Sequence, residues 1–122
     1  MNQAVTACVI VIGNEILSGR TQDTNLNHIA TTLGGWGIQV HHARVIPDDE
    51  DIIVNTINEV RTTYDYIFTT GGIGPTHDDI TAVCIAKAFA VPVIQHPEIA
   101  ERIRQRPAPD DIMASRLLMA RV

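Results

Sequence analysis

A glycine-rich turn flanked by carboxylates is the stretch of this sequence whose residue types could do chemistry. It follows the apolar residues 66–68 and precedes apolar residues at helical spacing that begin at Ile80. Clustered glycines let the backbone adopt positive φ and leave room for a ligand beside the main chain. The amide groups of the following helix favour an anion, so the sequence predicts a phosphate-handling loop. The candidate residues of this loop are Thr70, Gly71, Gly72, Gly74, Pro75, Thr76, Asp78, Asp79 and Thr81.

The loop carries carboxylates where a phosphate site usually has a cation. No Lys or Arg occurs between Arg61 and Lys87. Instead the loop contains Asp78 and Asp79, and Asp48 follows another apolar segment. Two like unit charges about 4 Å apart repel by roughly 1 to 4 kcal/mol, depending on exposure. The loop therefore either binds no anion or binds one through a divalent metal ion, for which Mg²⁺ is the candidate because it takes a few carboxylates together with phosphate oxygens.

A structural role for the same carboxylates stays open. Asp78 or Asp79 would be the N-cap of the helix after the loop, and Asp48 the N-cap of the helix before it. The glycines do not form a Walker A loop, because no Gly-Lys-Ser/Thr follows them, and they do not form the dinucleotide-binding pattern either.

Alternating strands and helices must position these residues. Residues 5–12 are apolar without alternation, which predicts a strand buried on both faces, as in a parallel sheet. Further strands are expected over 38–46, 65–70 and 91–94, and helices over 22–33, 49–64, 78–89, from 97 and from 110. This order predicts an α/β fold, a three-layer α/β/α sandwich around a mostly parallel sheet. Ligands of such sheets bind at the carboxyl ends of the strands, so Glu15 is also a candidate.

Composition limits the classes of partner. The 122 residues suffice for one domain, 1–122. A net charge of −5 argues against nucleic acid or an anionic membrane as the main partner, and 4% aromatic residues leave no row of stacking platforms. The longest apolar run, 7–12, is too short to span a bilayer, and no secretory signal is visible at the N-terminus. Cys8 and Cys84 have no disulfide-framework or metal-ligand spacing, which fits the cytoplasm.

Several other reactive side chains are expected to be structural. His28 belongs to the solvated side of its helix, and Cys84 to the core. His41 and His42 are neighbours in a strand and point to opposite faces, so they do not form a metal pair.

Three motifs in this order resemble a known family. They are 13–19 (Gly-Asn-Glu-Ile-Leu-Ser-Gly), 23–25 (Asp-Thr-Asn) and 70–81, which contains the glycine-rich loop. The loop resembles the signature of the molybdopterin-binding domain of the MoaB/Mog type. Taken together, the motifs are similar to the N-terminal domain of the competence/damage-inducible, CinA-like proteins. The resemblance covers about residues 5–120.

The resemblance implies two chemistries. In the molybdopterin branch such domains bind the pterin and, in some members, adenylylate it with ATP and Mg²⁺. The carboxylates of that branch match Asp48 and Asp79, which become the candidate catalytic and metal-binding residues. In the CinA-like branch the resemblance implies ADP-ribose pyrophosphatase activity with a divalent metal. It also implies a dimer or trimer. The residues that it adds to the ligand site are Gly13, Asn14, Glu15, Asp23 and Asn25.

The sequence departs from the family pattern at two places. Ile73 stands where the molybdopterin branch has Thr, which removes a hydroxyl near the ligand. The resemblance also implies a further strand and a second Gly/Pro loop beyond Val122, so that the domain is expected to be truncated at its C-terminal end.

The first hypothesis is a domain that binds a pterin or adenine-nucleotide phosphate with Mg²⁺ or another divalent cation, in the context of molybdenum cofactor biosynthesis. The alternatives are an ADP-ribose pyrophosphatase and a non-catalytic ligand-binding or oligomerisation module.

Overall fold

The computed structural model describes residues 4–122, which form strands, helices and one 3₁₀ helix. In chain order these are β1 (Val5–Ile12), α1 (Asn14–Leu17), α2 (Asn25–Gly35), β2 (Ile38–Ile46), α3 (Glu50–Val60), β3 (Tyr66–Thr70), α4 (Thr81–Phe89), α5 (Pro97–Arg104), α6 (Asp110–Leu117) and the 3₁₀ helix η1 (Leu118–Ala120). The longest helices, α2 and α3, have 11 residues each. Within residues 4–122, no helix has the length and apolar character needed to cross a membrane.

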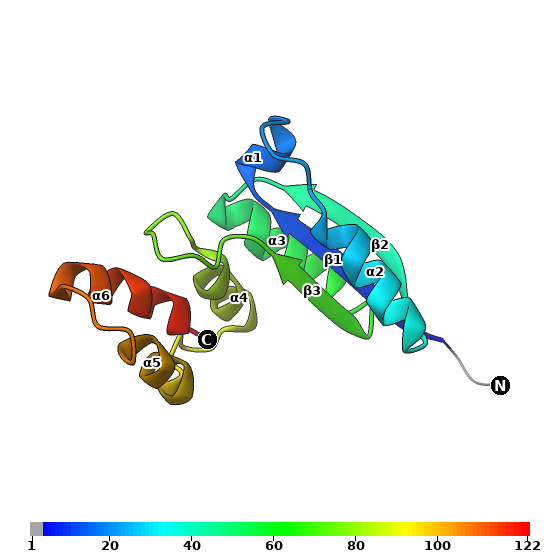
Figure 1. Cartoon of the computed structure of the whole chain (residues 1–122). Helices are drawn as coiled ribbons and strands as arrows, with labels where there is room; N and C mark the ends of the chain where they lie inside the picture. Colours follow the sequence, from blue (N-terminus) through cyan, green and yellow to red (C-terminus); the bar gives the residue numbers. More distant parts are fainter. Residues whose placement is uncertain (1–3) are drawn as a thin grey trace.

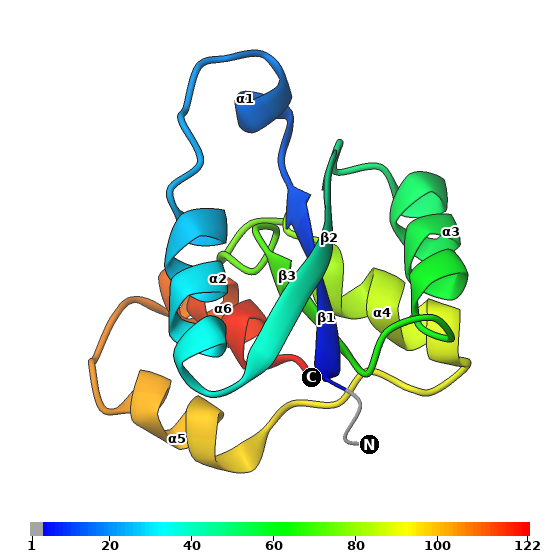
Figure 2. The same ribbon diagram turned by 90° about the vertical axis from the view of Figure 1, so that its right-hand side faces the viewer.

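The described residues build a three-stranded sheet in the order β2-β1-β3, and both strand pairs are parallel. The central strand β1 is buried from Ala7 to Ile12, as its unbroken apolar run predicted. Helix α2 covers one face of the sheet, and α3 and α4 cover the other (Figure 2). This arrangement confirms the α/β fold. Because the strands are parallel, their carboxyl ends meet at one edge, where α1 and the start of α3 also lie (Figure 1).

The core lies between the sheet and the helices α3 and α4. Ile53, Ile57 and Val60 form the inward stripe of α3 and are at most 3% exposed. They pack in one cluster with Ile10 of β1 and Cys84 of α4. Full burial of each large aliphatic side chain contributes about 1.5–3 kcal/mol. The cluster therefore fixes the two helices whose first turns border the carboxyl edge of the sheet.

The strand expected over 91–94 is wrong. Helix α4 ends at Ala90, whose left-handed conformation (φ 54°) turns the chain, and Pro92 has no N–H to give to a sheet. The segment instead pairs with the C-terminal end of the described chain through an isolated antiparallel bridge. Ile94 and Val122 exchange backbone hydrogen bonds of 2.8 Å in both directions.

The helix after the glycine-rich loop begins later than expected. Helix α4 starts at Thr81 rather than near residue 78, and its N-cap residue is Ile80, without a side-chain cap. The expectation that Asp78 or Asp79 caps this helix is therefore wrong. The carboxylate of Asp79 accepts a hydrogen bond from the backbone N–H of Thr76, which holds residues 76–79 in a turn outside the helix.

Helix α3 is capped by Asp49, the neighbour of Asp48. The Asp49 carboxylate accepts a hydrogen bond of 3.1 Å from the backbone N–H of Ile52. The capping role considered for Asp48 is therefore filled by the next residue along the chain. The short helix α1 was not among the helices expected from the sequence.

Candidate functional site

The glycine-rich loop lies against the end of the central strand. Gly71 follows β3 with φ +89°, and a Cβ atom there would collide with the backbone carbonyl oxygen of Ile12. The end of β2 is also bonded to the residue after β1, because the N–H of Gly13 donates a 3.0 Å hydrogen bond to the carbonyl of Ile46. Only glycine at position 71 allows this close approach of loop and strand.

Thr81 anchors the loop from the first turn of α4. Its hydroxyl donates to the carbonyl of Gly71 at 2.9 Å, and its N–H donates to the carbonyl of Gly72 at 3.1 Å. Gly72 has φ +66°, and a Cβ atom there would overlap the Thr81 hydroxyl. The side chain is 1% exposed. The structure thus gives Thr81, which the sequence predicted as a ligand contact, a definite part in holding the loop.

Asp79 is turned into the loop. Its Oδ2 accepts hydrogen bonds from the backbone N–H of Thr76 at 2.9 Å and from the Thr76 hydroxyl at 2.8 Å, and it lies beside Gly74. The backbone hydrogen bond from Thr76 is the main cause that lowers the pKa of this carboxyl, and Arg121 adds to the effect. The carboxylate is therefore held ionised and oriented by the loop itself.

The ends of all three strands contribute to one cavity at the carboxyl edge. Its volume is about 380 Å³. It is lined by Asn14, Asp48, His77, Asp78 and Ile80. Asn14 follows β1, Asp48 follows β2, and the other residues come from the loop after β3. Asp48 is half-buried, whereas the side chain of Asp78 is 79% exposed and lies 3.4 Å from the His77 ring.

The structure thus brings together three residues that the sequence selected, namely Asn14, Asp48 and Asp78. Asp79 does not line this cavity. Among residues 4–122, no group of three or more His, Cys, Asp and Glu side chains forms a ready-made metal site. Mg²⁺ commonly uses one or two carboxylates and completes its shell with phosphate oxygens and water. The donor set of this cavity fits a cation that arrives with a phosphate, and a metal shared by Asp48 and Asp79 stays a prediction.

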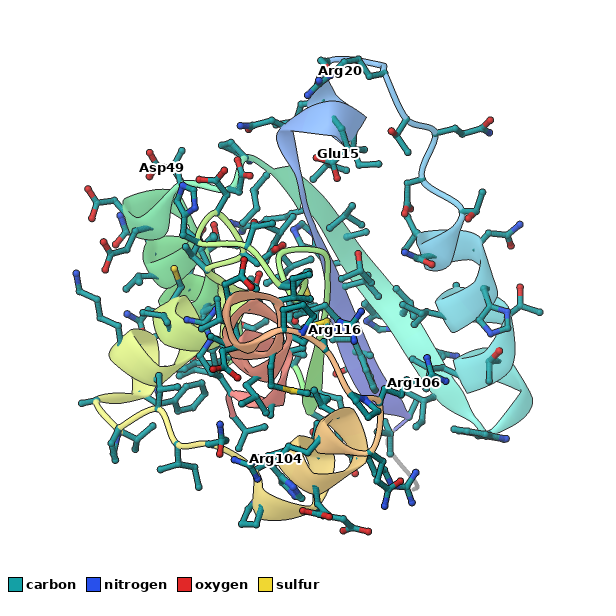
Figure 3. The ribbon with its side chains drawn as sticks, turned by 60° about the vertical axis from the view of Figure 1, so that its left-hand side comes forward. Glu15, Arg20, Asp49, Arg104, Arg106 and Arg116 are labelled. Carbon is teal, nitrogen blue, oxygen red and sulfur yellow. The ribbon has the colours of Figure 1, made fainter. Side chains whose placement is uncertain are left out.

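The remaining predicted residues border this edge or shape the elements beside it. Asp23 accepts hydrogen bonds from the N–H groups of Asn25 and Leu26, at 3.2 and 3.1 Å, and so organises the start of α2. Glu15 lies on α1 at the same end of the molecule as Asp49 (Figure 3). Ligand contacts by Gly13, Glu15, Asp23, Asn25, Thr70 and Pro75 stay predictions.

Arg121 is a residue of the site that sequence reasoning missed. Its Nη2 donates a 2.8 Å hydrogen bond to the carbonyl of Asp79, 42 residues away, and its Nε donates to the carbonyl of Leu118 at 3.0 Å. It also lines a cavity of about 180 Å³ beside residues 72–74. No local pattern signals this contact, because it depends on the C-terminal segment returning to the loop. The loop therefore has a cation beside it after all.

His28, His41, His42 and Cys84 were expected to be structural rather than functional, and their surroundings agree with this. His28 is exposed. His42 accepts a 3.0 Å hydrogen bond from Nε of Arg44 and stacks on Tyr64, whereas the exposed His41 lies 2.9 Å from the side chain of Gln39. Cys84 is fully buried, and burial raises the pKa of its thiol.

The geometry defines a class of protein, a parallel α/β domain with a glycine-rich loop and carboxylates at the carboxyl edge of its sheet. The family model described as "Probable molybdopterin binding domain" matches residues 8–122. The chain belongs to this family.

Two of the curated relatives are much longer proteins. A protein named "Probable FAD synthase" from Caenorhabditis elegans is 39% identical over 105 residues, which are 86% of this chain and 20% of that protein. A "CinA-like protein" from Syntrophotalea carbinolica is 36% identical over 102 residues, which are 84% of this chain and 25% of that protein. The chain thus spans a quarter or less of the length of these relatives.

Solved structures show the same fold. CinA from Thermoplasma acidophilum, a protein of unknown function, superposes with a TM-score of 0.86 at 34% identity, over 98% of this chain and 70% of that chain. The molybdopterin biosynthesis enzyme MoaB from Thermus thermophilus has a TM-score of 0.65 at 23% identity, over 92% of this chain and 70% of that chain. The second likeness concerns the fold alone.

Proposed function

We propose that this domain binds a phosphate-bearing small molecule, a pterin or an adenine nucleotide, with Mg²⁺ or another divalent cation at the carboxyl edge of the sheet. The observation that carries the proposal is the cavity to which Asn14, Asp48 and Asp78 contribute from three strand ends. Ligands of open α/β sheets bind at this edge. The glycine-rich loop offers backbone close to the ligand, and the carboxylates offer ligands for a cation between them and a phosphate.

Each residue of the site has a role in this proposal. Asp48 would hold the cation, together with Asp78 from the cavity or Asp79 from the loop. Thr81 and Arg121 act as positioning residues, because they fix the carbonyl groups of Gly71 and Asp79. When bound, the cation would offset the charge of a phosphoryl group and polarise it. The chain itself would hold the cation and orient the phosphate.

A second candidate is hydrolysis of ADP-ribose, which consumes water and gives AMP and ribose 5-phosphate. FAD is a pyrophosphate-linked adenine nucleotide, as ADP-ribose is, so the 39% identity to a protein named FAD synthase supports an adenine-nucleotide ligand. The third candidate is a binding or oligomerisation module without turnover. In each case we propose a single CinA N-terminal-type domain that acts in the cytoplasm as a homodimer or homotrimer.

Calorimetric titration with ADP-ribose and with ATP, in Mg²⁺ and in EDTA, tests the proposal. We expect Asp48→Asn to weaken Mg²⁺-dependent binding about tenfold or more, since one cation ligand is lost. Asp51→Asn is the matched control, because Asp51 is an exposed carboxylate in the first turn of α3 that does not line the cavity. Equal affinity in Mg²⁺ and EDTA, or equal losses in both variants, would contradict the proposal.

Product analysis separates the three candidates. The protein is incubated with ADP-ribose, and separately with ATP and molybdopterin, with and without Mg²⁺. AMP from ADP-ribose identifies the hydrolase, and pyrophosphate release from ATP that requires molybdopterin identifies the transferase. Tight binding without either product identifies the module.

A further inference from the structure

Arginines gather in a second cavity, between α5 and α6. Its volume is about 470 Å³, within the range of about 300–1,000 Å³ that is common for small-molecule sites. It is lined by Ile99, Arg102, Ile103, Arg106, Arg116 and Met119. None of these residues belongs to the carboxyl-edge cavity or to the loop.

The local sequence explains how the cavity forms. Residues 99, 102, 103 and 106 follow the spacing of one helical face, so α5 and the turn after it present two isoleucines and two arginines together. The helix is fixed at its start, where Nδ1 of His96 accepts a 3.3 Å hydrogen bond from the N–H of Ile99. Pro107 and Pro109 end it, and the chain returns as α6. This return brings the half-buried Arg116 to the same cavity.

The charge of this cavity is not balanced by the chain. Within residues 4–122, none of Arg102, Arg106 and Arg116 forms an ion pair with a carboxylate. Residues 98–121 contain five arginines and four acidic residues, Glu98, Glu101, Asp110 and Asp111, and none of these acids lines the cavity. Three guanidinium groups that line one cavity without a carboxylate partner can all donate to one anion. The lining of the cavity therefore favours a bound anion.

The position of the cavity distinguishes it from general surface charge. Arg106 and Arg116 lie away from the end of the molecule that carries Glu15 (Figure 3). Arg104, although on the same helix, does not line the cavity and instead donates a 3.3 Å hydrogen bond to the side chain of Gln95. Met119 lines both the arginine cavity and the small cavity beside residues 72–74, so the two adjoin.

We propose that this cavity is a second anion site, which takes the phosphate group of a phosphorylated small molecule. Guanidinium groups bind phosphate through paired N–H donors, and three of them suit a group with several charged oxygens. The isoleucines and Met119 supply an apolar wall for the body of such a molecule. Among residues 4–122, no aromatic side chain lines the cavity. The inference stands independently of the proposed function.

Titration with inorganic pyrophosphate in EDTA tests this site alone, because EDTA removes the divalent cation on which the proposed carboxyl-edge site depends. The arginine Nε–Hε signals are followed by NMR spectroscopy. We expect saturable shifts of the Arg102, Arg106 and Arg116 signals. Because each variant removes one charged donor pair, Arg106→Gln and Arg116→Gln should weaken binding about tenfold each. Arg104→Gln is the matched control and should change the affinity less than about twofold.

The outcomes either support or overturn the site. Equal losses in Arg104→Gln and Arg116→Gln would show diffuse attraction and overturn it, as would the absence of saturable shifts at the arginine side chains. Citrate that binds as tightly as pyrophosphate would overturn the phosphate class. Thermal unfolding of every variant shows whether it is folded. If Arg116→Gln does not fold, Arg102→Gln replaces it, because Arg102 is at an exposed position of α5.

Discussion

At the scale of single residues, a side chain that the sequence predicts as a ligand contact can also hold the backbone in place through hydrogen bonds. The sequence identified Thr81 and Asp79 by type and spacing near glycines. The structure shows Thr81 bonded to the carbonyl of Gly71 and Asp79 bonded to Thr76. Sequence cannot assign these bonds, because they depend on where the loop lies relative to α4. These hydrogen bonds hold the glycine-rich loop in place without a ligand.

Gly72→Ala tests how much the close contact between the loop and Thr81 contributes to the stability of the domain. The residue has φ +66°, and a Cβ atom would overlap the Thr81 hydroxyl. We expect a loss of about 1–3 kcal/mol in the free energy of unfolding, measured by urea denaturation, because the left-handed conformation and the overlap both cost energy. Gly34→Ala in α2 is the control, since a Cβ atom there meets nothing within 4 Å and should stabilise the helix by up to about 1 kcal/mol. Equal unfolding midpoints for the two variants would contradict this prediction.

Asp79 gives the stability a dependence on pH. Its folded-state pKa is lowered, first by the backbone hydrogen bond from Thr76, so the unfolded state binds the proton more readily. This contribution is present above the ordinary carboxyl pKa of about 3.9 and is lost as the pH falls through the lowered value. We expect the melting temperature of Asp79→Asn to fall less steeply than that of the unmodified protein below about pH 4. If the melting temperatures of Asp79→Asn and of the unmodified protein fall by the same amount as the pH is lowered, this role of Asp79 is contradicted.

At the scale of elements, the apolar periodicity of the sequence predicted the strands and helices that depend on local sequence alone. The buried strand β1, the strand β2 and the inward stripe of α3 follow directly from apolar patterns. The segment 91–94 has strand-like residues, but its partner is the C-terminal segment rather than the sheet. The start of α4 was misjudged because Asp79 bonds backward to Thr76 instead of forward into the helix. The arginine cavity and the position of Arg121 depend on how α5 and α6 return, which no local pattern contains.

Arg121 connects the C-terminal segment to the glycine-rich loop, and Arg121→Gln should loosen both. The guanidinium donates to the carbonyls of Asp79 and Leu118, and hydrogen bonds to a charged group are worth about 1.5–3 kcal/mol. We expect a loss of that order in unfolding free energy and faster hydrogen exchange at the N–H groups of Ile94 and Val122. Arg20→Gln is the control, because Arg20 is exposed and, among the described residues, its side chain bonds only to the nearby Ser18. Unchanged exchange at Ile94 would contradict the connection.

At the scale of the whole molecule, the structure separates chemistry from stability. Asp48 and Asp78 line the cavity at the carboxyl edge, three arginines line the cavity between α5 and α6, and the apolar residues of β1, α3 and α4 form the core between sheet and helices. Both cysteines of the chain belong to that core and are unpaired. Cys8 lies on the central strand and Cys84 on a helix packed against it, so the two thiols report on the same packed unit from different elements.

Thiol labelling should therefore measure global unfolding. Both side chains are fully buried, and burial raises the pKa of each thiol, so little reactive thiolate is present or accessible in the folded state. We expect a disulfide reagent to label Cys8 and Cys84 at one common slow rate, which rises with denaturant in step with the unfolding measured by circular dichroism. The variants Cys8→Ala and Cys84→Ala assign each signal, after their own unfolding free energies have been measured. If Cys84 reacts much faster than Cys8 in native buffer, α4 opens by itself, and the helix that anchors the glycine-rich loop through Thr81 is not part of the rigid core.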